Sequence, residues 1–150
     1  MRLRELFSEE TVNLDLAAED KGEALRELVA LLSLDEASET TLFRTLKRRE
    51  NLGSTGIGKG IAIPHCRSLV VPRLHLAYGR HRSGLDFKAI DDAPVHHCFL
   101  IIAPPLEVSN QYLPVLGKIA QFAKDPDIPG LLSGLEDAQG FLQLLDERAP

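Results

Sequence analysis

Apolar side chains recur with a helical period in two stretches of the N-terminal third of the chain. Residues 21–33 place apolar side chains three and four positions apart, which predicts an amphipathic helix. Asp20 stands where an N-cap is expected, and Glu23 follows it three residues later, as in a capping box. A second helix is predicted to begin at an N-cap at Ser38 and to end near Arg49.

Shorter apolar stretches predict strands. Residues 8–16 place Thr11, Val12 and Leu14 in near-alternation, and residues 74–82 alternate loosely before a turn signal at residues 83–84. Residues 61–63 form a short apolar run rich in β-branched side chains, which is typical of a buried strand. Residues 95–103 are almost continuously apolar, which predicts a central strand covered on both faces.

In the C-terminal third of the chain, apolar residues again recur at helical intervals. Pro114 is tolerated only in the first turn of a helix, so the next helix should begin near residues 111–114 and run to about Lys124. This places Tyr112 at a helix N-terminus, the end that favours anions. A short helix over residues 127–134 and a further one from Leu135 to Glu147 complete the prediction.

The predicted order is a strand, two helices, further strands and then helices. In a chain of 150 residues, 44% of them hydrophobic, this order predicts an α/β fold. We expect a single domain over residues 1–150, with a mixed β-sheet of about four to five strands flanked by helices.

Charge and composition exclude several classes of protein. The net charge of -5 gives no electrostatic support for nucleic acid or an anionic membrane as the main partner. No apolar run is long enough to span a membrane, and residues 1–5 do not resemble a signal peptide. Two cysteines, Cys66 and Cys98, are too few for a disulfide framework. We therefore expect a cytoplasmic protein without direct membrane insertion.

The residues that could bind an anion or react with one are concentrated in positions 53–65, with the sequence GSTGIGKGIAIPH. Successive glycines leave backbone N–H groups open to an approaching anion, and nearby hydroxyls add donors. The apolar run and Pro64 then deliver His65 to the edge of a sheet, since proline cannot donate to a strand ladder. The pattern predicts an imidazole beside an anion-binding loop. The predicted loop comprises Ser54, Thr55, Gly56, Gly58 and Gly60.

The same loop argues against nucleotide binding. Residues 53–59 fit the spacing G-x-x-x-x-G-K, but Gly60 stands where a P-loop requires Ser or Thr. A P-loop also follows a strand and opens a helix, whereas this loop follows a predicted helix and opens a strand. A dinucleotide-binding fingerprint fails for the same reason.

Residues 49–65, with the pattern R-E-x-x-G-S-T-G-I-G-x-G-I-A-I-P-H, closely resemble a known family. They are similar to the IIA components of the fructose/mannitol class of the phosphoenolpyruvate-dependent sugar phosphotransferase system. The stand-alone nitrogen-regulatory branch is most similar. The resemblance extends along nearly the whole chain, including residues 87–91 and 95–104. It implies the IIA fructose/mannitol-type fold.

The resemblance also implies roles for individual residues. His65 matches the histidine that accepts a phosphoryl group from a histidine-containing phosphocarrier protein. Arg49 matches the family arginine, and it shares a helical stripe with core leucines, so its guanidinium is expected near the glycine loop and the phosphoryl oxygens. The reaction requires no metal and no cofactor. The chain would thus be a phosphoryl-transfer component, and whether it is an enzyme in its own right stays open.

One position departs from the family pattern. Tyr112, followed by Leu113, stands where the family usually carries a second histidine. A phenol can donate one hydrogen bond to a phosphoryl oxygen but cannot do so as a cation, so we expect slower transfer. The alternatives are a sugar-uptake IIA subunit and a regulatory binding module that has lost catalysis. We expect no fused IIB or IIC portion, an expectation that favours a regulatory role exerted through other protein targets over delivery to a separate IIB subunit.

The remaining histidines do not predict a metal centre. His96, His97 and Cys98 are consecutive, so a strand places them on alternating faces rather than around one ion. His75 and His81 are expected to be surface or packing residues. Cys66 follows His65 directly and is expected to be a site of oxidation rather than a nucleophile.

Overall fold

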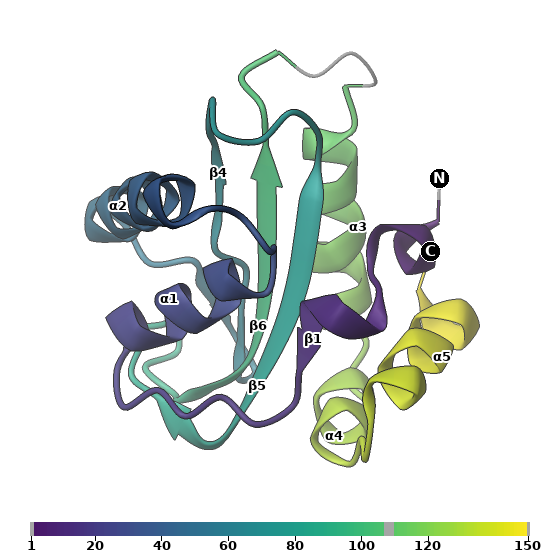
Figure 1. Ribbon diagram of the computed structural model, residues 1–150. Helices are drawn as coiled ribbons and strands as arrows, with labels where there is room; N and C mark the ends of the chain where they lie inside the picture. The colour runs from purple at the N-terminus through teal and green to yellow at the C-terminus, as the bar shows by residue number, and fades with distance from the viewer. Residues whose placement is uncertain (1, 107–109, 150) are drawn as a thin grey trace.

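A mixed β-sheet separates two helical layers in the computed structural model, which describes residues 2–106 and 110–149 (Figure 1). The strand order is β1-β5-β6-β3-β2, and β4 also pairs with β6. The strands are β1 (Val12–Asn13), β2 (Gly56–Gly58), β3 (Ile61–Ala62), β4 (His65–Arg67), β5 (His75–Leu85) and β6 (Val95–Ala103). The mixed α/β fold is confirmed. The described residues form six strands, and the additional ones are too short to show a period in the sequence.

Strand β6 lies at the centre, as its apolar run predicts. It pairs antiparallel with β5, where Tyr78 faces Phe99. On its other side it pairs parallel first with β3 and then with β4, where His65 faces Ile101. Pro64 lies between β3 and β4, and its carbonyl accepts a hydrogen bond of 3.0 Å from the N–H of Ile101. The prediction that Pro64 follows a strand is confirmed, but the chain then resumes as a second short strand.

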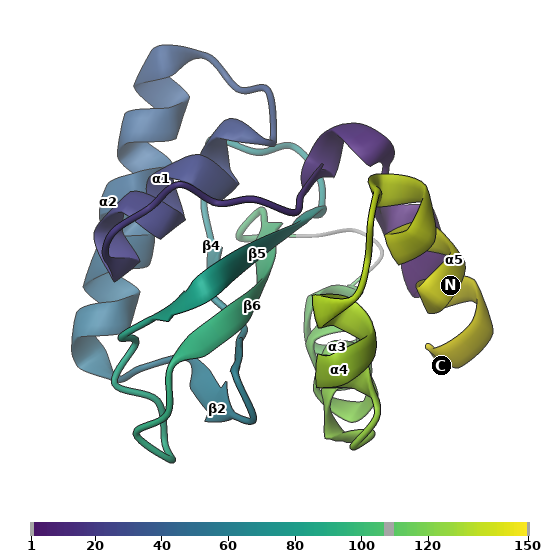
Figure 2. The same ribbon diagram turned by 90° about the horizontal axis from the view of Figure 1, so that it is seen from below.

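The helices cover both faces of the sheet (Figure 2). Helices α1 (Lys21–Ala30) and α2 (Glu36–Leu52) pack on one face. The other face carries α3, α4, α5 and the N-terminal turns. Their bounds are η1 (Leu3–Leu6), η2 (Glu9–Thr11), α3 (Tyr112–Lys124), α4 (Ile128–Ser133) and α5 (Ala138–Arg148).

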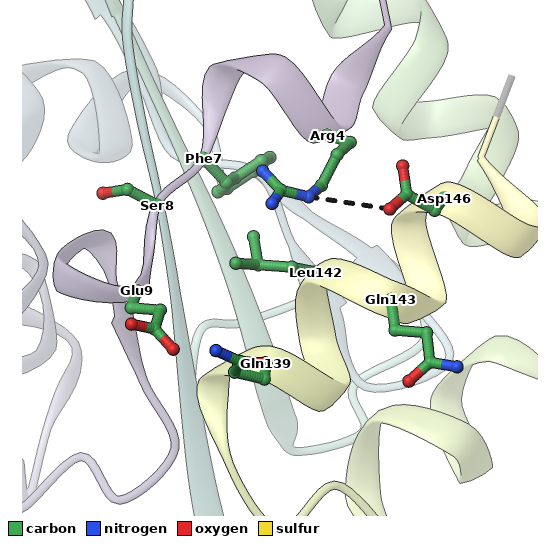
Figure 3. A pocket seen from close by; sticks show the side chains of 8 residues that line it. All are labelled: Arg4, Phe7, Ser8, Glu9, Gln139, Leu142, Gln143 and Asp146. Carbon is green, nitrogen blue, oxygen red and sulfur yellow. Dashed lines mark ion pairs between the residues drawn. The ribbon is translucent and has the colours of Figure 1, made fainter.

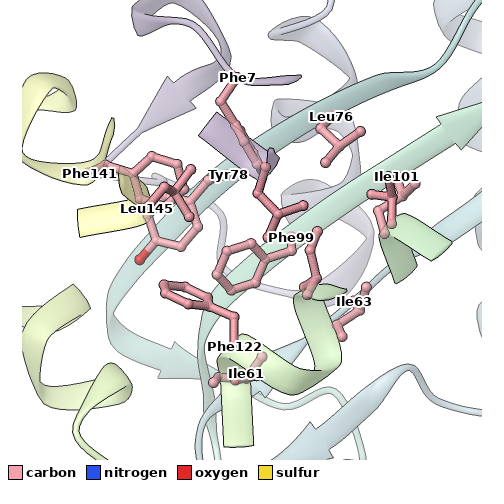
Figure 4. Packing of buried hydrophobic residues seen from close by; sticks show 14 of the residues in the cluster. Phe7, Ile61, Ile63, Leu76, Tyr78, Phe99, Ile101, Phe122, Phe141 and Leu145 are labelled. Atoms are coloured by element: carbon pink, nitrogen blue, oxygen red, sulfur yellow. The ribbon is translucent and has the colours of Figure 1, made fainter. Parts of the chain in front are cut away.

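Each layer has its own hydrophobic core. Leucines of α1 and α2 pack against Ala62, Cys66 and Cys98 on one face. On the other face the rings of Tyr78 and Phe141 stack with centroids 4.4 Å apart, next to residues from the central strands and α3 (Figure 4). From Cys98 to Ala103, alternate residues of β6 enter the two cores, so this part of the strand is buried on both sides.

Several predicted boundaries differ from those of the structure. The α2 N-cap is Asp35, whose carboxylate accepts a 2.8 Å hydrogen bond from the N–H of Ser38, so Ser38 is the third helical residue and not the cap. The prediction that Asp20 caps α1 is confirmed, since its carboxylate accepts from the N–H of Glu23. The helix ends at Ala30, however, and not at residue 33 as predicted. Residues 8–11 are largely a 3-10 turn, which reduces the first strand to two residues.

The predicted turn at residues 83–84 is also wrong. Strand β5 continues to Leu85, and its register with β6 shifts between Arg80 and Leu85. Gly84, at φ 91°, lies inside this irregularity. A bulge of this kind permits the glycine within the strand, so the sequence signal marked a bulge and not the end of the element.

Buried Arg80 joins β5 to the C-terminal helical layer. Its Nη1 atom donates to the carbonyls of Leu132, Ser133 and Leu135 at 3.0, 3.1 and 2.8 Å. Its Nε atom donates to the Leu14 carbonyl at 3.0 Å. These carbonyls lie at and beyond the end of α4, where a cation is favourable, and so the guanidinium fixes α4 against the sheet.

Candidate functional site

His65 lies at an edge of the sheet, half-buried, as the first residue of β4. Its ladder partner Ile101 belongs to the core on the α3 side, whereas the next residue, Cys66, belongs to the core on the α2 side. Because side chains alternate along a strand, the imidazole faces the α3 layer. The expectation that Pro64 delivers His65 to a sheet edge agrees with this placement.

A single hydrogen bond defines the tautomer of the His65 ring. Its Nδ1 atom lies 2.6 Å from the carbonyl oxygen of Ile63. A carbonyl only accepts hydrogen bonds, so Nδ1 carries the proton and donates it. In the neutral ring the lone pair is therefore on Nε2, which is the nitrogen able to act as a nucleophile.

Tyr112 lies next to this imidazole, as the first residue of α3. The two ring centroids are 6.3 Å apart and the ring planes are inclined by 54°. Burial raises the pKa of the Tyr112 phenol to about 12, and the positive charges of Arg67 and Arg49 oppose that rise only in part. The phenol is therefore protonated at neutral pH and can act as a donor beside His65.

Arg67 is a neighbour of His65 that sequence reasoning missed. It is two residues further along β4 and thus on the same face of the strand. Its guanidinium carbon lies 4.4 Å from the centre of the Tyr112 ring. Its Nη1 atom donates to the carbonyls of Pro104 at 3.0 Å and Pro105 at 3.4 Å. The period of two from His65 was the signal that could have revealed it.

Arg49 approaches from the other helical layer. It lies in the last turn of α2, and its Nη1 atom donates to the Gly53 carbonyl at 2.7 Å. The guanidinium therefore lies beside the glycine-rich segment, as expected. The helical stripe of buried leucines does not continue through Arg49, which is half-buried; the buried residue in that turn is Glu50, only 5% exposed.

Glu50 connects α2 to the glycine-rich segment, a role that the sequence analysis did not assign. Its carboxylate accepts hydrogen bonds from the Thr55 N–H at 3.2 and 3.1 Å and from the Thr55 hydroxyl. Lys21 forms an ion pair with it at 3.2 Å. A buried carboxylate satisfied in this way fixes the path of the chain between α2 and β2.

Several donors of the glycine-rich segment already have partners. The segment forms the hairpin β2–β3, and three of its backbone N–H groups bond within the protein. The Thr55 N–H donates to Glu50, that of Gly56 to the Ser54 hydroxyl at 3.0 Å, and that of Lys59 to Asp91 at 3.1 Å. The Ser54 hydroxyl in turn donates to the Phe87 carbonyl at 2.6 Å. These donors are therefore engaged within the fold, and the anion-binding role of the segment stays a prediction.

The glycines also serve the backbone of this hairpin. A Cβ atom at Gly56 would lie 2.7 Å from the Cβ of Ala89, closer than two carbon atoms can approach. Gly60 has φ 79°, and its carbonyl accepts from the N–H groups of His96 and His97. Gly58, like Gly60, adopts a positive φ. Close packing and positive φ values are thus a structural reason for glycine at these positions, whether or not an anion binds here.

Both thiols are in their less reactive form. Cys66 and Cys98 are free and buried, and burial raises the pKa of each to about 12. Because the thiolate is the reactive form, this raised pKa argues against the expectation that Cys66 is a site of oxidation. Within residues 2–106 and 110–149, no three His, Cys, Asp or Glu side chains converge in a way that could hold a metal ion.

A second histidine forms a buried network on the α4 side. The Tyr78 hydroxyl lies 2.8 Å from Nδ1 of His97, and Nε2 of His97 lies 3.3 Å from the Ser133 hydroxyl. Burial and the nearby charges lower the pKa of His97 to about 4, so the ring is neutral at pH 7. A neutral imidazole carries one N–H, so one ring nitrogen donates and the other accepts within this network.

The surface also holds a groove of about 440 Å³ between the N-terminal turns and α5 (Figure 3). Arg4 and Asp146, which both line it, form an ion pair of 3.7 Å across it. Helix α5 packs against η1, η2 and β1, and β1 is the edge strand beyond β5, whereas β4, which carries His65, pairs with the other side of β6. The groove is therefore separate from the His65 cluster. No helix among the described residues is long and apolar enough to cross a bilayer.

Comparison with known proteins points to one family. The family model for the phosphoenolpyruvate-dependent sugar phosphotransferase system, EIIA 2, matches residues 5–148. A nitrogen regulatory protein of Bradyrhizobium diazoefficiens is 32% identical over 146 residues, which cover 97% of this chain and 95% of that protein. The crystal structure of nitrogen regulatory protein IIA-Ntr from Neisseria meningitidis superimposes with a TM-score of 0.86 and 30% identity, covering 95% of this chain and 98% of that one.

A longer relative matches as well. The fructose-specific EIIABC component of the phosphotransferase system of Bacillus subtilis is 28% identical over 151 residues. The match covers 98% of this chain but only 23% of that protein. The chain therefore corresponds to one portion of the fructose-specific relative and to almost the full length of the nitrogen regulatory proteins.

Proposed function

Because the chain belongs to the EIIA 2 family of the phosphoenolpyruvate-dependent sugar phosphotransferase system, we propose that it is a phosphohistidine carrier. Nε2 of His65 accepts the phosphoryl group from the phosphohistidine of a histidine-containing phosphocarrier protein. The new P–N bond forms as the P–N bond of the donor breaks, and the donor imidazole leaves with the electron pair. The reaction proceeds by in-line displacement at phosphorus.

The hydrogen bond between Nδ1 of His65 and the Ile63 carbonyl is the observation that carries this proposal. It fixes the ring in the orientation that presents Nε2, so no rotation or change of tautomer precedes the attack. As the N–P bond forms, positive charge develops on the imidazole. The carbonyl oxygen, 2.6 Å from Nδ1, stabilises that charge.

Arg49 and Tyr112 are proposed to hold the transferring group. The Arg49 guanidinium supplies positive charge toward the phosphoryl oxygens, and the protonated Tyr112 phenol supplies one hydrogen-bond donor. Ser54, Thr55, Gly56, Gly58 and Gly60 act indirectly, because the hairpin that they form fixes the positions of Arg49 and Ile63.

A regulatory role is favoured over sugar uptake. The match with the nitrogen regulatory protein covers nearly the whole of both chains, and the IIA-Ntr structure superimposes over the same extent. We propose that the phosphorylation state of His65 controls binding to regulatory protein targets in nitrogen metabolism, within the cytoplasm. Delivery to a separate IIB subunit is the second candidate, supported by the match to the fructose-specific component.

Phosphorylation in a reconstituted system tests the proposal. The protein is incubated with phosphoenolpyruvate, enzyme I and the carrier protein, and its intact mass is measured before and after acid treatment. We expect an acid-labile gain of one phosphoryl group that His65→Ala abolishes and His75→Gln retains. No gain with a carrier that phosphorylates a known IIA domain in the same mixture would favour the non-catalytic binding module.

A further inference from the structure

Arg67 has the position and the chemistry of a second cation at the His65 site. We propose that Arg67 binds the phosphoryl group on His65 and that Tyr112 holds the Arg67 guanidinium in place for this purpose. The proposal rests on the phosphocarrier function of His65. It assigns to the neighbouring arginine the charge that the neutral phenol of Tyr112 does not supply.

The strand geometry places Arg67 within reach of the reacting nitrogen. Residues two apart on a strand project from the same face, about 6.6 Å from one another along the strand. Cys66, between them, points into the opposite core. The extended arginine side chain spans this separation, and both His65 and Arg67 are half-buried, so each retains contact with the surface.

Two contacts fix the guanidinium. Its face lies over the Tyr112 ring at 4.4 Å, an arrangement that is attractive for a cation and an aromatic ring. Its Nη1 atom is anchored to the carbonyls of Pro104 and Pro105, directly after β6. Among the described residues, the hydrogen bonds of Arg67 all use Nη1. The edge that carries Nε and Nη2 matches the fork geometry with which arginine binds phosphate oxygens.

Charge supports the same conclusion. The chain has a net charge of -5, yet no carboxylate among the described residues lies within ion-pair distance of Arg67 or Arg49. The two guanidinium groups come from different elements, β4 and α2, and the positive charge of each acts on the Tyr112 phenol beside His65. A dianionic phosphoryl group on Nε2 would lie among these positive charges, and two cations stabilise it better than one.

The test separates binding of the phosphoryl group from transfer between proteins. His65 is phosphorylated chemically with phosphoramidate, and the phosphoryl group is titrated by 31P NMR. A guanidinium in contact lowers the phosphoryl pKa, so Arg67→Gln should raise that pKa by about 1. Arg67→Lys keeps the charge and should restore most of the wild-type value. Arg73→Gln, the matched control at an exposed arginine, should leave the pKa unchanged.

Transfer from the carrier protein gives a second readout. At saturating carrier, we expect Arg67→Gln to slow single-turnover phosphorylation of His65 by about 10-fold to 100-fold, with little change in the carrier concentration at half-saturation. The melting temperature of each variant is measured alongside, and Arg67→Lys covers the case in which Arg67→Gln does not fold.

The outcomes distinguish the two proposals. An unchanged phosphoryl pKa and an unchanged rate in a folded Arg67→Gln protein overturn the role of Arg67. Chemical phosphorylation without transfer from a competent carrier overturns the carrier function but leaves the contact measurable. A wild-type protein that takes no phosphoryl group from either donor overturns both.

Discussion

The carboxylate of Glu50 accepts hydrogen bonds from both the backbone N–H and the hydroxyl of Thr55, five residues later in the chain. This pair joins the end of α2 to the hairpin that precedes His65. Lys21 completes the contact from α1. The position of the site therefore depends on a buried charge that has no place in the chemistry itself.

Replacement of Glu50 should destabilise the fold. Glu50→Ala leaves the N–H and the hydroxyl of Thr55 without their partner in a buried setting and removes the ion partner of Lys21. We expect the free energy of unfolding to fall by about 3 kcal/mol. Urea denaturation measures it, with Glu136→Ala, at an exposed loop position, as the control. A loss below about 1 kcal/mol would contradict the anchoring role.

Removal of the Tyr112 hydroxyl should affect transfer more than stability. Tyr112→Phe keeps the ring under the Arg67 guanidinium but loses the proposed donor. We expect phosphorylation of His65 to slow by about 10-fold in single-turnover measurements. Transfer at the wild-type rate would show that the hydroxyl does not contact the phosphoryl group. Leu113→Ala, at the exposed neighbouring position, is the control.

Acidification should destabilise the protein through His97. Its pKa is lowered to about 4 in the folded state, whereas an unfolded histidine titrates near 6.5. The unfolded chain therefore binds more protons between these values, and stability must fall as the pH drops from about 6.5 to about 4. The loss from this residue should reach roughly 3 kcal/mol.

Urea denaturation at several pH values checks this dependence. His97→Gln removes the titrating group, so its stability should change less than that of the wild type across the same range. His75 contributes in the same direction, because burial and Arg73 lower its pKa as well. His75→Gln is therefore the comparison, and its effect should be smaller. Parallel curves for the wild type and His97→Gln would contradict the assignment.

Loss of the buried guanidinium of Arg80 should loosen the C-terminal helical layer. Arg80→Met keeps the length of the side chain but removes the donors to the carbonyls at the end of α4. We expect the free energy of unfolding to fall by roughly 2–3 kcal/mol. Hydrogen exchange should quicken in α4 more than in α2, and equal changes in both helices would contradict a local role. Arg82→Met, at an exposed neighbour, is the control.

The long elements could be predicted from the sequence because each shows a sustained period. The β6 bounds, Val95–Ala103, match the predicted run, and α3 begins at Tyr112, as Pro114 requires. The short strands β2 and β4 could not be predicted. Two or three residues show no period, and these strands exist only because β3 and β6 supply their hydrogen-bond partners.

The candidate site was predictable in part. The sequence predicted His65, Arg49 and Tyr112 as site residues, and the structure places Tyr112 beside His65 and close enough to Arg49 for its charge to lower the pKa of the phenol. The glycines indicated an anion-binding loop, but composition could not show that the N–H groups of Thr55, Gly56 and Lys59 have partners within the fold. Arg67 was missed because β4 was not predicted as a strand, so its shared face with His65 could not be recognised.

The hairpin before His65 leaves the Ile63 carbonyl without a backbone partner from β2. The N–H of Ile63 donates to the Thr55 carbonyl, whereas the Thr55 N–H, which would return that bond in an antiparallel pair, donates to Glu50. The Ile63 oxygen accepts from the imidazole instead. If the Glu50 carboxylate were removed, the Thr55 N–H could take that oxygen, and the ring would be released to interconvert between its two tautomers. The protonation pattern of this histidine is thus tied to a carboxylate on α2, without any substitution near the phosphorus atom.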